Sequence, residues 1–232
     1  ISIGIKIIPN SSKTEAELLD FNKQYNLNLP FISENGSSIH GLNLIHKDLP
    51  NKISISRPAD QIISIYNEII PNNLKQKINF ILKLKLEEQK KIFGLPSTKM
   101  MLASKRNYSL PIQFMGNEIE KKEFFKIINN VGLTVQTGGR IMNICDNVNK
   151  SKAMSKALRL ISKELDDEII TIGVGDNEND IEMIKQTNHP CLVKNDNFNS
   201  SLINIDNLIK SSEPSPLGWA DVIKTAIQKI GS

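Results

Sequence analysis

The stretch IITIGVGDNENDIEMI, residues 169–184, decides the fold. A short apolar run ends in Gly-Val-Gly, and the carboxylates of Asp176, Glu178 and Asp180 follow it closely. An apolar run of this length, bounded by glycines, predicts a buried strand, and the residues from Asn179 onward have the spacing of a helix. Carboxylates this close to one another repel and resist burial, so we expect a cation to bind at the loop between them.

The composition excludes several classes of protein. The 232 residues are 39% hydrophobic, which suits one domain or two small ones with a real core. The net charge of +4 comes from scattered lysines, which disfavours nucleic-acid binding and suits an anionic small substrate. No apolar run approaches the roughly 20 residues of a membrane span, so no membrane partner is expected. Cys145 and Cys191 lie far apart in apolar contexts, which predicts neither a disulfide nor a metal cluster and favours the cytoplasm.

Hydrophobic periodicity predicts helices and strands that alternate at both ends of the chain. Residues 14–26 are expected to form a helix with Thr14 as its N-cap and with Leu18, Leu19 and Phe21 facing inward. The other expected elements are a strand or a helix end at 1–9, a strand and turn at 29–39, helices interrupted at Pro71 within 56–94, a short helix at 95–106, an extended segment at 107–115, a helix at 117–132, a hairpin at 133–145, a helix at 149–165, a strand at 168–175, a helix at 179–187, a strand at 190–195 and a closing helix at 215–230.

This order of elements predicts an α/β protein with a parallel sheet interrupted by an inserted α+β domain. The expected boundaries place the core in residues 1–48 and 147–232 and the inserted cap in residues 49–146. The sequence does not determine the oligomeric state.

Three polar clusters follow predicted strands or begin helices, at residues 10–13, 149–152 and 175–180. In an open α/β sheet, ligands bind beyond the carboxyl ends of the strands. Together the clusters offer hydroxyls, a lysine and carboxylates, a set that suits a phosphate group and a hard cation such as Mg²⁺. Each cluster alone is equally typical of a capping or surface segment, so the combination carries the prediction.

At this point the sequence resembles a known family. VGDNENDIEMI, VNKSKAM and IIPNSSKTEAEL resemble the fourth, third and second motifs of the haloacid dehalogenase-like (HAD) phosphatases. SSKT, ISENGSSI, SKRNYSLP, GGRIMNI and SPLGWADVI together resemble the mannosyl-3-phosphoglycerate phosphatase branch, which has a cap of type IIB. These matches extend over nearly the whole chain.

The resemblance implies a Rossmann-like HAD core with an inserted cap, and Mg²⁺-dependent hydrolysis of the phosphate monoester of a glycosyl-3-phosphoglycerate. The product would be a compatible solute such as mannosylglycerate or glucosylglycerate. Ser11 would bind the phosphoryl group, Lys150 would offset its charge, and Asp176 would bind Mg²⁺ with Asn179 and Asp180 in support. The residues implied to face the sugar and glycerate are Lys13, Glu34, Asn35, Arg106, Tyr108, Ser109, Gly139 and Arg140.

The sequence departs from the family in ways that affect chemistry and specificity. The first motif, DxDGT, supplies the attacking aspartate that forms an aspartyl-phosphate, and no DxD occurs in these residues. Because the chain begins at Ile1, just before SSKT, we expect that motif to precede it and the 232 residues alone to be inactive. Asn149 and Ser151 replace an acid and a glycine, and Asn107 and Leu110 replace two acids of the cap. These changes make glucose a competitor to mannose as the sugar.

Two other functions remain open at this stage. One is a broader sugar-phosphate phosphatase of the same superfamily, and the other is a non-catalytic module that binds Mg²⁺ and sugar phosphates. Simpler roles also remain open: Asn35-Gly36 is a turn signal by itself, Arg140 suits a surface position on a strand, and Tyr108 suits packing between cap and core.

Overall fold

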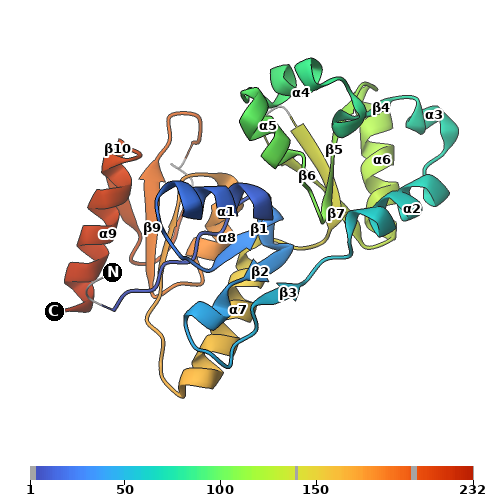
Figure 1. Ribbon diagram of the computed structural model, residues 1–232. Coiled ribbons are helices and arrows are strands. Elements are labelled where there is room, and N and C mark those ends of the chain that lie inside the picture. The colour runs from blue at the N-terminus through green and yellow to red at the C-terminus, as the bar shows by residue number, and fades with distance from the viewer. Residues whose placement is uncertain (1–3, 139–140, 200–202, 232) are drawn as a thin grey trace. The chain divides into compact units, whose positions relative to one another are not determined.

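A computed structural model gives the fold and describes residues 4–138, 141–199 and 203–231 (Figure 1). The chain forms two compact units, Ile1–Val148 and Asn149–Ser232. Helices and sheets are mixed in both units, so the α/β class is confirmed. The expected boundaries of core and cap stay a prediction.

The first unit begins with a helix and a small antiparallel sheet. Thr14 caps helix α1 (Glu15–Gln24) through a capping box with Glu17, as its position before the helix predicts. A sheet of order β1-β2-β3 follows. Its strands are β1 (Phe31–Ser33), β2 (Ser38–His40) and β3 (Lys52–Ser54), and the short 3₁₀-helices η1 (Glu34–Gly36) and η2 (Leu42–Leu44) connect them.

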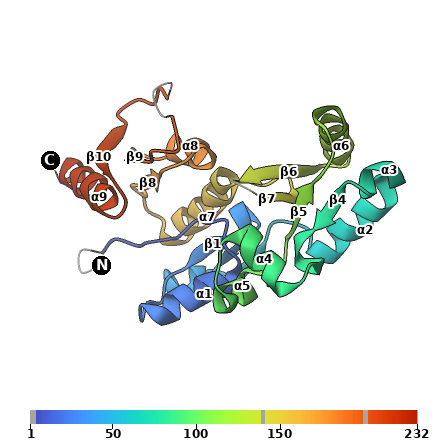
Figure 2. The same cartoon turned by 90° about the horizontal axis from the view of Figure 1, so that it is seen from above.

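A four-stranded antiparallel sheet of order β4-β5-β7-β6 forms the rest of the first unit. Its strands are β4 (Ile78–Phe80), β5 (Ser109–Phe114), β6 (Leu133–Gly138) and β7 (Ile141–Asp146). The helices of this part are α2 (Ala59–Ile69), α3 (Asn72–Lys75), α4 (Leu86–Phe93), α5 (Ser97–Ala103) and α6 (Glu118–Asn130), with η3 (Ile81–Lys83). Helices α2 and α6 lie beside the sheet (Figure 2) and share one apolar core with it, because β-strand alternation gives that face Ile112 and Ile144.

The second unit is a three-stranded parallel sheet of order β10-β9-β8 with helices on both faces. Its elements are α7 (Lys150–Leu165), β8 (Ile172–Gly175), η4 (Glu178–Asp180), α8 (Ile181–Ile184), β9 (His189–Lys194), β10 (Ile209–Pro214) and α9 (Leu217–Ile230). Helix α9 runs along β9 and β10 (Figure 1). Cys191 and Val193 point to α9, whereas Leu192 packs with Met183 and Ile184 of α8, so both faces of β9 are buried.

The structure differs from the expected elements at several places. Residues 4–9 form no strand, and the pairing next to them is a single parallel bridge between Asn10 and Ile32. The helix expected at 179–187 is only α8, preceded by η4, because Asp180 turns back into the loop. Within 56–94, where only helices were expected, residues 78–80 form β4, because they pair antiparallel with β5. Strands β3 and β10 were not expected either, β10 because its sequence, IKSSEP, is polar. No helix in the described part of the chain has the length and apolar character needed to cross a membrane.

Candidate active site

The acidic loop directly follows β8, and a glycine permits its sharp turn. A Cβ atom on Gly175 would lie 2.3 Å from the Cβ of Asp180, so no larger residue fits without displacing that side chain. Asn177 then begins η4, and its Oδ1 accepts a hydrogen bond from the Glu178 N–H at 2.7 Å. The sequence GDNEND therefore folds back on itself and brings Asp180 against the end of the strand.

Asp180 lies inside this loop and holds it in shape. Its side chain is 7% exposed, and its Oδ1 accepts a hydrogen bond from Lys150 Nζ at 2.6 Å. Its Oδ2 accepts from the N–H groups of Asp176 and Asn177, each at 3.2 Å. Lys150 is the first residue of α7, which fixes its position. A buried charge pair is favourable only with such additional hydrogen bonds, so Asp180 and Lys150 form one supporting group.

Asp176 presents its carboxylate at the surface of the loop. Its Oδ2 accepts a hydrogen bond from Asn195 Nδ2 at 3.3 Å, and both Asp176 and Asn179 are exposed. Carboxylate and carboxamide oxygens are the ligands that Mg²⁺ prefers, so the exposed donors fit such an ion. The structure thus separates the predicted metal residues into two exposed donors and the buried Asp180. Metal binding by them stays a prediction.

Asn195 was missed in the sequence analysis, although a signal was present. It directly follows β9, the parallel neighbour of β8. A polar residue after the next parallel strand lies at the same edge of the sheet. The run KNDN at residues 194–197 therefore carried the same kind of signal as GDNEND.

In the first unit, Ser11 and Lys13 belong to a segment tied to the loop after β1. Ser11 N–H donates to Ile32 O at 3.0 Å, and Ser11 O accepts from the Asn35 N–H at 2.9 Å. Lys13 O accepts from the Glu34 N–H at 2.9 Å. The Lys13 ammonium group is exposed and lies 3.4 Å from Glu17 Oε1 of the first turn of α1. These bonds place the predicted phosphate-binding and sugar-binding segments side by side.

Glu34 is the centre of the strongest polar cluster in this unit. The residue is 3% exposed. Its carboxylate accepts hydrogen bonds from Asn107 N–H at 2.8 Å, Tyr108 N–H at 3.2 Å and Ser109 Oγ at 2.6 Å. Arg106 Nη1 also donates to Ser109 Oγ, at 3.1 Å. The structure therefore brings together four of the predicted substrate residues, and Glu34 acts there as an acceptor for the segment before β5.

Tyr108 and Asn35 use their side chains within the protein. Tyr108 is 6% exposed, and its hydroxyl lies 2.7 Å from Ser54 Oγ, which supports the packing role left open for it. Asn35 Nδ2 donates to Gln136 Oε1 at 2.9 Å. Gln136 was missed because no local pattern connects it to a residue 101 positions away. Gly139 and Arg140, also predicted to face the substrate, lie outside the described residues.

An ion pair that the sequence analysis missed joins the two segments flanking the four-stranded sheet. Arg57 precedes α2, and Asp146 ends β7. Arg57 Nε donates to Asp146 Oδ1 at 2.8 Å, its Nη2 also contacts Oδ1, and its backbone N–H donates to Oδ2. A guanidinium group that holds a carboxylate through two nitrogens fixes both direction and distance, so this pair locks the segments together.

Neither cysteine suits nucleophilic chemistry. Burial raises the pKa of the Cys145 thiol to about 12, with further contributions from the carboxylates of Asp146 and Glu34. Burial likewise raises the pKa of Cys191 to about 11. Because the thiolate is the reactive form, both thiols are inert near neutral pH.

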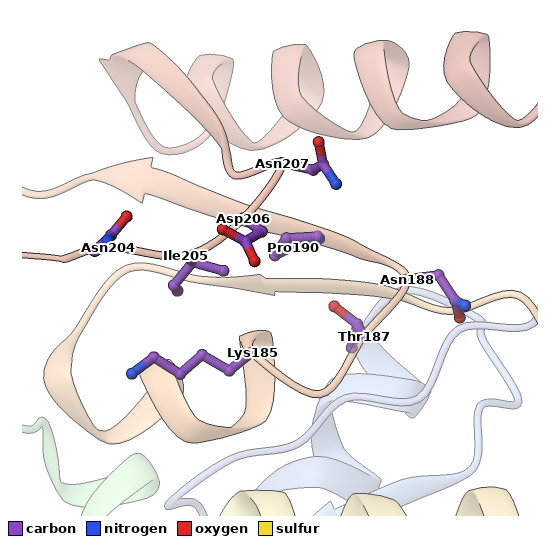
Figure 3. Close-up of a pocket in the computed structure, with 8 residues that line it drawn as sticks. All are labelled: Lys185, Thr187, Asn188, Pro190, Asn204, Ile205, Asp206 and Asn207. Carbon is purple, nitrogen blue, oxygen red and sulfur yellow. The ribbon is translucent and has the colours of Figure 1, made fainter.

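A shallow pocket of about 560 Å³ in the second unit lies away from the acidic loop (Figure 3). It is lined by Lys185, Thr187, Asn188, Pro190, Asn204, Ile205, Asp206 and Asn207. These residues precede or begin β9 and β10, so they lie at the amino ends of the strands, whereas the acidic loop follows the carboxyl end of β8. In Figure 3 the Lys185 side chain extends away from Asp206. Ligands of parallel sheets bind at the other edge, so this pocket is not the candidate site.

Comparisons with known proteins agree with the motifs. Residues 1–205 match the family described as haloacid dehalogenase-like hydrolase. The chain is 30% identical, over 97% of its length, to the glucosyl-3-phosphoglycerate/mannosyl-3-phosphoglycerate phosphatase of Methanococcoides burtonii, of which it covers 86%. It is 26% identical, over 98% of its length, to the protein of the same name from Persephonella marina, again covering 86%.

The fold agrees with solved structures of the same superfamily. A HAD-superfamily phosphatase from Bacteroides thetaiotaomicron aligns with a TM-score of 0.63 at 16% identity, covering 97% of this chain and 82% of that one. At this identity the alignment supports the fold alone. Because the matched residues include both Ser11 and the acidic loop, and because one curated relative reaches 30% identity over nearly the whole chain, the chain belongs to the haloacid dehalogenase-like hydrolase family.

Proposed function

We propose that this protein is a Mg²⁺-dependent phosphatase that hydrolyses a glycosyl-3-phosphoglycerate to the glycosylglycerate and inorganic phosphate. The observation that carries the proposal is the acidic loop, in which the buried pair of Lys150 and Asp180 holds Asp176 at the surface. The names of the Methanococcoides and Persephonella relatives support the choice of substrate.

The residues of the second unit have distinct roles in this proposal. Asp176 would hold Mg²⁺, with the amide oxygen of Asn179 as a further donor, while Asn195, whose Nδ2 donates to Asp176 Oδ2, would orient the carboxylate. The bound ion would neutralise charge on the phosphoryl oxygens. Lys150 places a positive charge beside the loop and, through Asp180, keeps the Asp176 backbone in position. The loop therefore combines charge compensation with a fixed geometry, as phosphoryl transfer requires.

The residues of the first unit would bind the organic part of the substrate and its phosphoryl oxygens. The Ser11 hydroxyl is a hydrogen-bond donor suited to a phosphoryl oxygen, and its backbone is fixed by Ile32 and Asn35. The Arg106 guanidinium group suits the glycerate carboxylate, since its planar fork matches a carboxylate. Lys13, Gly139 and Arg140 are proposed to contact the glycerate and sugar, whereas Tyr108, whose hydroxyl lies 2.7 Å from Ser54 Oγ, is proposed to support this region by packing.

The attacking carboxylate is proposed to come from outside these residues, because they contain no DxD sequence. The sugar is proposed to be glucose or mannose. Asn107, which stands where the branch carries an acid, donates through Nδ2 to Glu15 Oε2 at 3.3 Å. A side chain occupied in this way is less available to a hydroxyl of either sugar, so the choice between glucose and mannose is left to the assay.

The test is phosphate release by the product of the complete reading frame, with Mg²⁺, from mannosyl- and glucosyl-3-phosphoglycerate. Hexose 6-phosphates test the broader sugar-phosphate alternative. We expect Asp176→Ala to reduce release by about a hundredfold or more, a loss typical of removing a key charge-stabilising group. Glu178→Ala removes an exposed carboxylate of the same loop and is the matched control, expected to keep at least half of the activity.

Each other outcome has a definite meaning. Faster release from hexose 6-phosphates than from either glycosyl-3-phosphoglycerate would replace the proposed substrate with the broader one. Absence of release, with Mg²⁺ and glycosyl-3-phosphoglycerate still binding in calorimetry, would identify a non-catalytic module. An equal loss of phosphate release in the Asp176→Ala and Glu178→Ala variants would contradict the specific role of Asp176.

A further inference from the structure

The four-stranded sheet has one apolar face and one polar face. Strand register places on the polar face Ser109 and Pro111 of β5, Asn143 and Cys145 of β7, and Thr134 and Gln136 of β6. The alternate residues, such as Ile112 and Ile144, lie in the apolar core with α2 and α6. On the described parts of β5, β6 and β7, this face carries hydroxyls and carboxamides beside Pro111, Ile141 and the Cys145 thiol, and it has no charged side chain.

A chain of hydrogen bonds fixes the orientation of Asn35 beside this face. Gln136 Nε2 donates to the backbone carbonyl of Val148 at 2.9 Å. A carbonyl oxygen only accepts, so the Gln136 amide has one possible orientation, and its Oε1 accepts from Asn35 Nδ2. Asn35 must therefore turn its Oδ1 away from Gln136. That oxygen is buried and has no hydrogen-bond partner among the described residues.

Asn143 presents a second oxygen of the same kind. Its Cα pairs with that of Gln136 across β6 and β7, and paired residues have Cβ atoms about 4.5–5.5 Å apart on one face. Asn143 Oδ1 is buried and likewise lacks a partner within the described chain. Buried polar atoms are nearly always hydrogen-bonded in native proteins, so two such oxygens flanking Gln136 indicate a bound group.

Arg106 adds a donor at the other end of the polar face. Its Nη1 donates to Ser109 Oγ at 3.1 Å, and Ser109 pairs with Cys145 on the same face as Asn143. Its Nε is buried and has no acceptor in the part of the chain that the structure describes. Glu34 joins the two ends, because it bonds Ser109 and precedes Asn35 in the chain. We name this arrangement of Asn35, Gln136, Asn143, Ser109 and Arg106 the polar ring.

The free atoms of the polar ring define the ligand chemically. The two acceptor oxygens, of Asn35 and Asn143, suit hydroxyl groups that donate to them, while the Arg106 donor at the other end stays available for the glycerate carboxylate. A second phosphate would face the carboxamide oxygens of Asn35 and Asn143 and the Glu34 carboxylate, which makes a neutral group the better match. We propose that Asn143 is a specificity-determining residue whose Oδ1 accepts a hydrogen bond from a hydroxyl of the glycosyl group. Gln136 is then a positioning residue that orients Asn35 toward the same group; this inference rests on the proposed function.

The test compares a substrate with the sugar and one without it. In the product of the complete reading frame, Asn143→Leu removes the acceptor at similar size. We expect it to raise KM for the glycosyl-3-phosphoglycerate about tenfold to a hundredfold, because a site built for a hydroxyl is left incomplete. Turnover of p-nitrophenyl phosphate, which carries no sugar, should change less than about twofold. Gln113→Leu, on the same face of β5, is the matched control and should leave both substrates unchanged.

Further variants keep the outcome decisive. Asn143→Asp retains an acceptor oxygen and should keep KM within about threefold of the wild type. This variant tests the role of the acceptor even if the Asn143→Leu change disturbs folding. Gln136→Leu should raise KM for the glycosyl substrate with kcat for p-nitrophenyl phosphate unchanged. An unchanged KM for the glycosyl substrate in Asn143→Leu overturns the proposal. An equal loss of activity toward both substrates, at an unchanged melting temperature, does so too. Neither outcome affects the proposed phosphatase function.

Failure of the proposed function is recognised separately. If the wild-type protein releases phosphate from neither substrate, the phosphatase proposal fails. Calorimetry with the glycosylglycerate, which lacks phosphate, then tests the polar ring directly. Binding that Asn143→Leu abolishes supports the sugar subsite, and binding that this variant retains, or absence of binding by the wild type, overturns it.

Discussion

Glu34 Oε2 lies 2.6 Å from Ser109 Oγ, and this hydrogen bond joins residues 75 positions apart in the sequence. Glu34 has a φ of 46°, a left-handed conformation that costs energy for a residue with a side chain. Such strain persists where surrounding contacts enforce it. Here the contacts are the bonds that the carboxylate accepts from Asn107, Tyr108 and Ser109. The backbone is therefore held in an unfavourable region by a side chain that is fully hydrogen-bonded.

Replacing Glu34 with Ala is expected to destabilise the protein. The change leaves two backbone N–H groups and one hydroxyl without their acceptor, and an unpartnered buried group costs about 1–3 kcal/mol. We expect the free energy of unfolding to fall by about 2–4 kcal/mol in urea titrations. Hydrogen exchange at the amides of Asn107 and Tyr108 should accelerate more than exchange in α6.

The control for Glu34 is Glu123→Ala, which removes an exposed carboxylate on α6. A surface substitution of this kind changes the free energy of unfolding by less than about 0.5 kcal/mol. If Glu34→Ala and Glu123→Ala have the same unfolding free energy, the buried carboxylate does not support the segment before β5.

Gly175→Ala is expected to damage the acidic loop. The added Cβ would lie 2.3 Å from the Cβ of Asp180 and 2.9 Å from its Oδ2, so the Asp180 side chain must move. That movement breaks its bonds to Lys150 and to the backbone of Asp176. Overpacking of this kind costs about 1–3 kcal/mol, and the Mg²⁺ concentration giving half-maximal activity should rise at least tenfold.

Gly231→Ala is the matched control for this prediction. A Cβ atom there meets only backbone oxygens at 3.9 Å or more, and the residue has a φ of −90°. The melting temperature of the Gly231→Ala protein and the Mg²⁺ dependence of its activity should equal those of the wild type. A Gly175→Ala protein with wild-type Mg²⁺ dependence would show that the loop tolerates a displaced Asp180.

Local signals predicted much of the fold. Thr14 and Glu17 form the capping box that begins α1, and the run before Gly175 forms β8, which is shorter than the strand expected at 168–175 and only partly buried. Strands β6 and β7 pair antiparallel in a continuous register, as the hairpin pattern predicts. These features depend on residues within a few positions of one another, so the sequence alone contains the information.

Long-range packing explains what the sequence analysis missed. Leu19 and Phe21 were expected to face inward but are 52% and 40% exposed, because α1 buries mainly Leu18. Strand β10 forms despite a polar sequence, since its parallel pairing with β9 and the packing of α9 supply the stabilisation. Tertiary context therefore overrode the local pattern at both places.

The sequence motifs named residues of the candidate site but not the hydrogen-bond partners of those residues. The motifs named Glu34, Asn35 and Asp180, and the structure places each among other predicted residues. Their partners, such as Gln136, come from strands far along the chain, so sequence spacing gave no indication of them. The structure therefore shows which polar groups are already hydrogen-bonded and which polar atoms remain available to a ligand.

The pH dependence of stability should reflect His40. Burial lowers its pKa from the ordinary value of 6.5, Glu15 acts in the opposite sense, and Lys52 lowers it further. As the pH falls through about 6.5, the unfolded chain takes up a proton before the folded protein does. Stability from this residue is therefore fully present above about pH 6.5 and is lost as the pH falls toward the lower folded pKa.

His40→Gln should remove this part of the pH dependence. The wild-type imidazole lies 2.7 Å from Ser38 Oγ through Nε2 and 3.4 Å from Glu15 Oε1 through Nδ1, and its burial disfavours the charged form. Urea titrations at about pH 5.5, 6.5 and 7.5 measure the slope, and His46→Gln controls for loss of an imidazole elsewhere in the unit. The variant should be less stable than the wild type at about pH 7.5, with the difference shrinking at about pH 5.5. A difference that stays constant across this range would mean that His40 contributes packing alone, and that other groups cause the acid sensitivity.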